Sequence, residues 1–125
     1  VHMMVDAITT MAGNARAGKV KVLGTTGKSR SGVAPEVPTV AEAGVPGYES
    51  GIWLGLMAPA STPRPLLERL NAEVNKVINA PDVREAWAKQ GAMPMGMTID
   101  QFDKFLRAEI VKWAKVVKVS GAKVD

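Results

Sequence analysis

The sequence is a 125-residue, 13.3 kDa chain with a formal charge of +4, and this composition excludes several classes of protein. Its 46% hydrophobic content rules out a disordered chain, and the absence of cysteine rules out disulfides, thiolate nucleophiles and Cys-based metal sites. Its 16 Lys and Arg residues are spread along the chain, and the densest group, Lys19, Lys21, Lys28 and Arg30, has no interleaved aromatic residue, so we expect a solvated basic surface and no binding of nucleic acid.

Short apolar runs alternate with turn signals in the first half of the chain, which predicts strands separated by short helices. We expect strands over residues 1–5, 19–25 and 52–58. Between the first two, residues 7–16 are expected to form a short helix with Asp6 as its N-cap. Because strands that alternate with helices usually pair in parallel, the sequence predicts an α/β protein with short parallel-type strands.

Two capping boxes are predicted, each from a Thr followed three residues later by Glu or Gln. Thr39 and Glu42 form the first, and Gly44 keeps the helix that it opens short. Thr98 and Gln101 form the second, which opens a long helix.

The second half of the chain is predicted to be helical. Thr62 is expected to cap one helix with Pro63 in its first turn, and a second helix is expected over residues 83–90. The long last helix is expected to end at Gly121. Apolar residues at spacings of three and four predict the inward faces of the first and last of these helices: Leu66, Leu67, Leu70, Val74, Val77 and Ile78, then Phe102, Phe105, Leu106, Ile110, Trp113, Val116 and Val117.

No residue pattern predicts catalysis or metal binding. His2 is the only histidine, so metal sites with two histidines are excluded, and a Ser-His-Asp arrangement would have to use the start of the chain. Residues 24–29 contain Gly, Lys and Ser but lack the spacing of a phosphate-binding loop. The carboxylates of Glu42 and Asp100 have structural explanations at helix starts. The sequence therefore predicts a chain that is not an enzyme and needs no cofactor or metal.

Five segments in a fixed order carry a family resemblance: AGKVKVL (17–23), PEVPTVAEAGVPGYE (35–49), WLGLMAPASTP (53–63), LNAEVNK (70–76) and KWAKVVK (112–118). Through them the chain resembles the C-terminal portion of the Bug (TctC-type) extracytoplasmic solute receptors of tripartite tricarboxylate transporters. The resemblance implies a fragment of a two-lobed periplasmic binding protein of type II-like fold. Residues 1–58 would belong to the second lobe, and residues 59–125 would form the C-terminal helical segment that packs on the first.

The resemblance also implies a function and a location. Receptors of this family close on a small organic carboxylate and, in the full-length protein, deliver it to membrane transporter subunits. The implied location is the periplasm, although residues 1–4 lack the charged and apolar segments of a secretory signal, so we expect no such signal in this stretch.

The turn formed by Asp6, Ala7 and Ile8 is the predicted ligand site. In α/β proteins, ligands bind where a parallel strand ends at the N-terminus of a helix. The N–H groups of Ala7 and Ile8 would hold a carboxylate directly or through water, and Asp6 would accept a hydrogen bond from a ligand hydroxyl, ammonium or bound water. The alternative is that Asp6 only caps the helix.

Gly51 and Gly55 are the predicted hinge. In the family, the segment leading into Pro59 passes from one lobe to the other, and glycine gives a hinge strand its backbone freedom. Glycine in a strand can instead admit a close packing neighbour.

A different class of function is also compatible with the sequence. The chain would then be a truncated structural module that binds nothing and associates with other copies of itself. Sheet edges and apolar helix faces would lack their partners in the isolated chain, so we expect a homo-oligomer; the alternative is that the chain refolds into one compact arrangement of its own.

Overall fold

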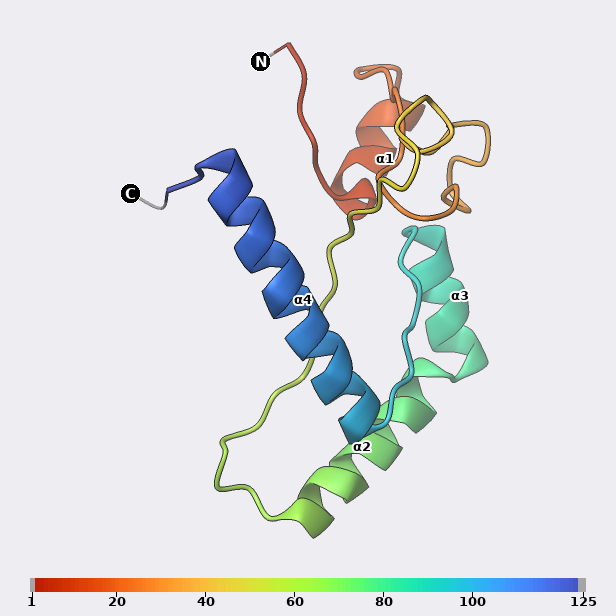
Figure 1. Ribbon diagram of the computed structural model, residues 1–125. Coiled ribbons are helices and arrows are strands. Elements are labelled where there is room, and N and C mark those ends of the chain that lie inside the picture. The colour runs from red at the N-terminus through yellow and green to blue at the C-terminus, as the bar shows by residue number, and fades with distance from the viewer. Residues whose placement is uncertain (1, 124–125) are drawn as a thin grey trace. The chain divides into compact units, whose positions relative to one another are not determined.

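The computed structural model describes residues 2–123. Its helices are α1 (Ile8–Arg16), α2 (Arg64–Ile78), α3 (Pro81–Lys89) and α4 (Ile99–Ser120) (Figure 1). The chain divides by its internal contacts into two compact units. The first unit contains the described residues up to Met57 together with Asn79–Pro94, and the second contains Ala58–Ile78 and the described residues from Met95 onward. The predicted division at residue 58 concerns the lobes of a longer receptor and stays a prediction.

Pairing between extended segments is limited, within the described residues, to one parallel bridge between Thr25 and Thr39. Of the strands expected over residues 1–5, 19–25 and 52–58, residue 1 lies outside the described residues and the rest is irregular apart from Thr25. A strand forms only where a neighbour pairs with its backbone, and the described residues of these runs have no such partner apart from the bridge at Thr25; most of their side chains are exposed, Leu54 at 97%. The one bridge is parallel, but it joins Thr25 to Thr39, which lies outside the expected strands.

α1 begins one residue later than expected. Ala7 is the N-cap and has no side-chain cap, whereas Asp6 Oδ1 accepts the N–H of Ala7 itself at 2.8 Å. The prediction that Asp6 is the N-cap is therefore wrong, because a carboxylate bound to the next residue does not reach the donors of the first turn.

The C-terminal end of α1 is a Schellman motif. Gly18 donates its N–H to Ala15 O at 3.0 Å, and Lys19 donates to Asn14 O at 3.0 Å. Gly18 has a φ of +69°, the left-handed conformation that this motif requires and that glycine adopts most readily.

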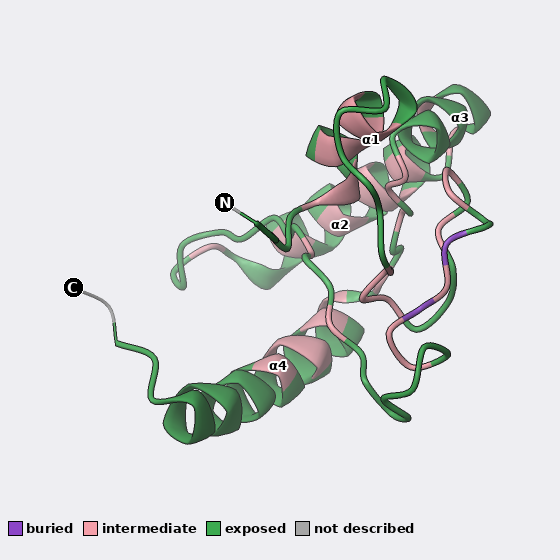
Figure 2. Ribbon diagram, turned by 90° about the horizontal axis from the view of Figure 1, so that it is seen from above, coloured by how far each residue is buried: buried purple, intermediate pink, exposed green. Residues whose placement is uncertain are grey.

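The buried residues of the described chain are Val37 and Thr39, both in the loop that follows Thr25 (Figure 2). The predicted capping box at Thr39 is confirmed, with Glu42 Oε2 accepting the Thr39 N–H at 2.8 Å and Thr39 Oγ1 accepting the Glu42 N–H at 3.1 Å. It closes a turn rather than a helix, as the nearby Gly44 at a φ of +121° requires. Arg30 Nε adds an ion pair to Glu42 at 2.9 Å.

Glu42→Gln is expected to remove part of the pH dependence of stability. The Thr39 N–H and the Arg30 guanidinium lower the pKa of Glu42 below its ordinary value. A carboxyl group with a lowered folded-state pKa stabilises the protein above the ordinary value, about 4.3, and loses that contribution as the pH falls through the lower value. The melting temperature of the wild type should therefore fall more steeply on acidification than that of Glu42→Gln. Glu36→Gln, which changes an exposed carboxyl of the same loop, should follow the wild type; parallel curves for all three proteins would contradict the expectation.

The second unit is built on α2 and α4, which contact each other. The Leu66 and Leu67 N–H groups donate to Pro63 O, so Pro63 precedes the first helical residue instead of lying in the first turn as expected. In the same way α3, in the first unit, begins at Pro81, ahead of the expected residue 83, because proline fits the first helical position.

α4 confirms its predicted ends. Thr98 and Gln101 form a complete capping box, and Gly121 ends the helix in the left-handed conformation at a φ of +68°. Phe102, Phe105 and Leu106 are half-buried, but every residue from Ile110 to Ser120 is exposed (Figure 2). The inward face predicted for this second half is therefore wrong, because α2 meets α4 near the start of α4 and does not run alongside its second half (Figure 1).

Candidate functional site

The candidate site is the start of α1, where the structure places Asp6, Ala7 and Ile8 next to one another. Asp6 is exposed, and Ala7 and Ile8 are half-buried. The Ala7 N–H is bound to Asp6, and the Ala7 carbonyl accepts the N–H groups of Thr10 at 3.1 Å and Met11 at 3.2 Å. Within residues 2–123, the N–H groups of Ile8 and Thr9 have no hydrogen-bond partner, as expected in the first turn of a helix. The free donors are thus those of Ile8 and Thr9, not the pair Ala7 and Ile8.

Two charges act on an anion at this turn: the N-terminus of α1 attracts it, and the carboxylate of Asp6 repels it. The N-terminus of a helix carries roughly half a positive charge, which stabilises a carboxylate placed there. α1 has no acidic residue in its first turn and has Arg16 in its last, so its own side chains do not neutralise that charge. Asp6, directly before the helix, opposes a second negative charge and suits a ligand that also offers a hydroxyl or a bound water.

Gly91 packs against Ile8, although it lies in the second of the two segments that make up the first unit, Asn79–Pro94. A Cβ at Gly91 would lie 2.9 Å from Ile8 Cγ2, 3.0 Å from Val33 Cγ2 and 3.6 Å from Ser31 Oγ. We call Ile8, Ser31, Val33 and Gly91 the Gly91 junction. The sequence predicts only that a helix ends at residue 90, just before Gly91, and the contact of Gly91 with the candidate site was missed because no local pattern reports a neighbour so distant in sequence.

The predicted hinge residues lie in an irregular stretch of chain that runs to Met57, where the first segment of the first unit ends. Gly51 and Gly55 are both exposed. A Cβ at Gly51 would meet no atom within 4 Å, so a close packing neighbour does not explain this glycine in the described structure.

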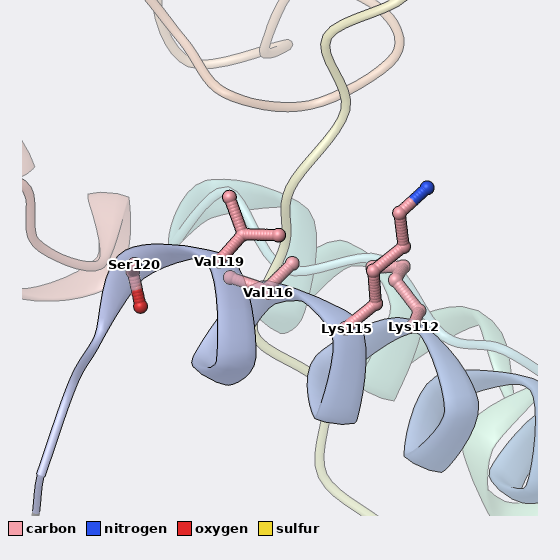
Figure 3. A pocket seen from close by; sticks show the side chains of 5 residues that line it. All are labelled: Lys112, Lys115, Val116, Val119 and Ser120. Atoms are coloured by element: carbon pink, nitrogen blue, oxygen red, sulfur yellow. The ribbon is translucent and has the colours of Figure 1, made fainter.

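A shallow hollow lies on the flank of α4, with a volume of about 420 Å³ (Figure 3). It is lined by Lys112, Lys115, Val116, Val119 and Ser120, all from one helix. Lys112 Nζ is engaged by Glu109 Oε1 at 2.7 Å and lies 5.4 Å from the centre of the Trp113 ring. Because its described lining comes from one helix and is largely valine and lysine stems, this hollow does not provide converging polar groups for a small ligand.

Two further types of site were sought in the described part of the chain. No group of three or more His, Cys, Asp or Glu side chains there is placed to hold a metal ion. Nor does any described helix combine the length and apolar character needed to span a membrane.

Sequence comparison places residues 1–122 in the match to a family described as "Tripartite tricarboxylate transporter family receptor". A protein of Pseudomonas sp. (strain P51), described as "UPF0065 protein in tcbD-tcbE intergenic region", is 43% identical over 118 residues, or 94% of this chain and 35% of that protein. Protein BugT of Bordetella pertussis is 38% identical over 109 residues, or 87% of this chain and 33% of BugT. The chain thus spans about a third of the length of these relatives.

Three solved structures share the fold. R. palustris Rpa4515 with adipate matches 91% of this chain and 38% of its own, at a TM-score of 0.82 and 32% identity. MatC (Rpa3494) from Rhodopseudomonas palustris with bound malate matches 88% of this chain and 38% of its own, at a TM-score of 0.77 and 36% identity. The periplasmic binding protein BugD matches 92% of this chain and 40% of its own, at a TM-score of 0.82 and 28% identity. These likenesses confirm the predicted fold class, part of a periplasmic binding protein, and the predicted resemblance to the Bug receptors.

Proposed function

Because the chain belongs to the tripartite tricarboxylate transporter receptor family, we propose that it forms part of an extracytoplasmic receptor for a small carboxylate. The receptor would capture its ligand in the periplasm and deliver it to membrane transporter subunits, without a chemical step. The observation that carries this proposal is that two solved relatives of the same fold hold dicarboxylates, adipate in one and malate in the other.

Within the chain, we assign the carboxylate contact to the start of α1. The free N–H groups of Ile8 and Thr9 supply two donors at the positive end of a helix, and a carboxylate can accept both. Asp6 would select ligands that carry a hydroxyl or arrive with a bound water beside the carboxylate. The hydroxyl group of malate has this chemistry, whereas adipate would need a water.

The isolated chain is expected to bind such ligands weakly. It matches 38% of each of the two ligand-bound structures, so most of a two-lobed site would be contributed by the rest of the receptor. A thermal-shift screen with dicarboxylates, aromatic acids and amino acids tests the function. A ligand at ten times its dissociation constant raises the free energy of unfolding by about 1.4 kcal/mol. Stabilisation at millimolar dicarboxylate that a neutral diol of equal length does not reproduce supports the proposal, and no stabilisation by any acid contradicts it for this chain.

The second candidate function is a structural module that associates and binds nothing. The exposed apolar flank of α4 favours it. The same screen separates the two, because an associating module without a ligand site would respond equally to every salt of the same ionic strength.

Gly51 and Gly55 are proposed to form the hinge of the receptor. In a two-lobed receptor that carries this stretch, Gly51→Ala together with Gly55→Ala is expected to slow closure and weaken ligand affinity, because alanine restricts the backbone change that a hinge absorbs. Stopped-flow fluorescence with the ligand measures both quantities. Gly32→Ala, at an exposed loop glycine with open space around it, is the control and should leave closure unchanged. Unaltered closure in the double variant would exclude the hinge role.

A further inference from the structure

Gly91 ends α3 with the same backbone motif that Gly18 uses to end α1. Gly91 donates its N–H to Ala88 O at 3.0 Å, and Ala92 donates to Trp87 O at 3.0 Å, which together make a Schellman motif. Gly91 has a φ of +76°, in the left-handed region where a side chain is strained. The backbone alone therefore accounts for glycine at this position, as it does at Gly18.

The surroundings of the two glycines differ. A Cβ at Gly18 would meet no atom within 4 Å, whereas a Cβ at Gly91 would overlap the Cγ2 methyl groups of Ile8 and Val33, at 2.9 and 3.0 Å. Both methyl groups are attached directly to a β-branched carbon. They cannot swing aside as the end of a long side chain can, and χ1 rotation is restricted in β-branched side chains. Relief of the overlap therefore requires either an unfavourable χ1 rotation or a movement of backbone, and on one side that backbone is the first turn of α1.

We propose that Gly91 is a positioning residue for the carboxylate-binding start of α1. It allows the end of α3 to pack directly on Ile8, and that contact fixes the first turn of α1 against the loop that carries Ser31 and Val33. The inference rests on the proposed function for its consequence in binding, but the contact itself does not depend on a ligand. Hydrogen bonds from Ile8 and Thr9 to a carboxylate weaken steeply with distance and angle, so a small displacement of this turn lowers affinity.

Gly91 in this way has two separable effects. Loss of the left-handed glycine strains the end of α3 and lowers stability, and loss of the space beneath Ile8 displaces the start of α1. Gly18→Ala reproduces the first effect without the second, since both glycines occupy the same place in the same motif within the first unit.

The test compares Gly91→Ala, Gly18→Ala and the double variant Gly91→Ala/Ile8→Ala in this chain by amide NMR, before and after addition of adipate. In the free protein, Gly91→Ala should shift the Thr9 and Thr10 amides, and Gly18→Ala should leave them in place. With adipate below saturation, the ligand-induced shift of Thr9 should fall by about tenfold in Gly91→Ala and by less than about twofold in Gly18→Ala. The double variant lacks the Ile8 side chain beyond Cβ, including the Cγ2 methyl group, and should regain most of that response.

Each outcome of these measurements either supports or overturns the positioning role of Gly91. Thr9 and Thr10 amides that respond alike to Gly91→Ala and Gly18→Ala would overturn the positioning role, whatever happens with adipate. A wild type that shows no adipate response would defeat the proposed function of the chain, while the shifts of the free variants still decide the contact. If Gly91→Ala loses its helical circular dichroism while Gly18→Ala keeps it, backbone strain alone does not explain the loss; recovery of the signal in the double variant then supports the steric role, and continued loss overturns it.

Discussion

The isolated chain is expected to run as a dimer or larger assembly, with a mass at least twice the 13.3 kDa of the monomer. The second half of α4 exposes a run of apolar side chains that no described part of its unit covers: Ile110, Val111, Trp113, Val116, Val117 and Val119. Contiguous apolar patches are rare on monomers, and the described chain buries only one hydrophobic side chain, Val37, to offset them. Association would bury this flank against a second copy. Size-exclusion chromatography with light scattering measures the mass directly.

One substitution on the flank and one elsewhere on α4 separate specific association from general stickiness. Val116→Glu places a charge within the apolar run, and should shift the mass towards that of a monomer. Ala108→Glu adds the same charge at an exposed position nearer the start of α4, and should leave the assembly intact. A monodisperse monomer that unfolds cooperatively at low concentration would show that α4 needs no partner.

Removal of two amide side chains is expected to destabilise the second unit strongly. Asn71 and Asn75, both on α2, each donate from Nδ2 to Met97 O at 3.0 Å, and Asn75 Nδ2 also donates to Asn71 O at 2.9 Å. They hold the chain that enters α4 against α2, just before the capping box at Thr98. Asn71→Ala with Asn75→Ala leaves the partly buried Met97 carbonyl without its donors. The cost is about 2–3 kcal/mol in free energy of unfolding.

Urea unfolding followed by circular dichroism measures that cost. Asn75→Asp keeps the shape of the side chain but places a charged acceptor against the Asn71 and Met97 carbonyl oxygens, so it should lose at least as much stability as Asn75→Ala. Arg84→Ala removes the exposed donor of a bond to Asn79 Oδ1, and should cost less than about 1 kcal/mol. A double variant that unfolds at the same urea concentration as the wild type would show that the amide contacts to Met97 add nothing.

Features set by a few neighbouring residues could be predicted from the sequence. The capping boxes at Thr39 and Thr98 and the helix end at Gly121 are confirmed, because each depends on the chemistry of four or five consecutive residues. The ion pair of Glu85 with Lys89 on α3, at 2.7 Å, follows from spacing in the same way.

Features that depend on residues far apart in the sequence could not be predicted from it. The apolar runs at residues 2–5 and 52–58 have the composition of strands, but pairing requires a neighbour that composition does not reveal. The periodicity of α4 identified its apolar face without showing that α2 would cover only its first half. At the candidate site, the sequence identified the turn at Asp6 to Ile8, whereas the packing of Gly91 on Ile8 is visible only in three dimensions.

The measurement that tests the central claim most directly is a titration of the isotope-labelled chain with adipate, followed at every amide. The account predicts saturable shifts centred on Ile8 and Thr9, with a dissociation constant of about 1 mM or weaker, and no such response to a neutral diol of the same length at matched ionic strength. Shifts scattered over the lysine-bearing surface, or none at the start of α1, would contradict the claim that this turn binds a carboxylate.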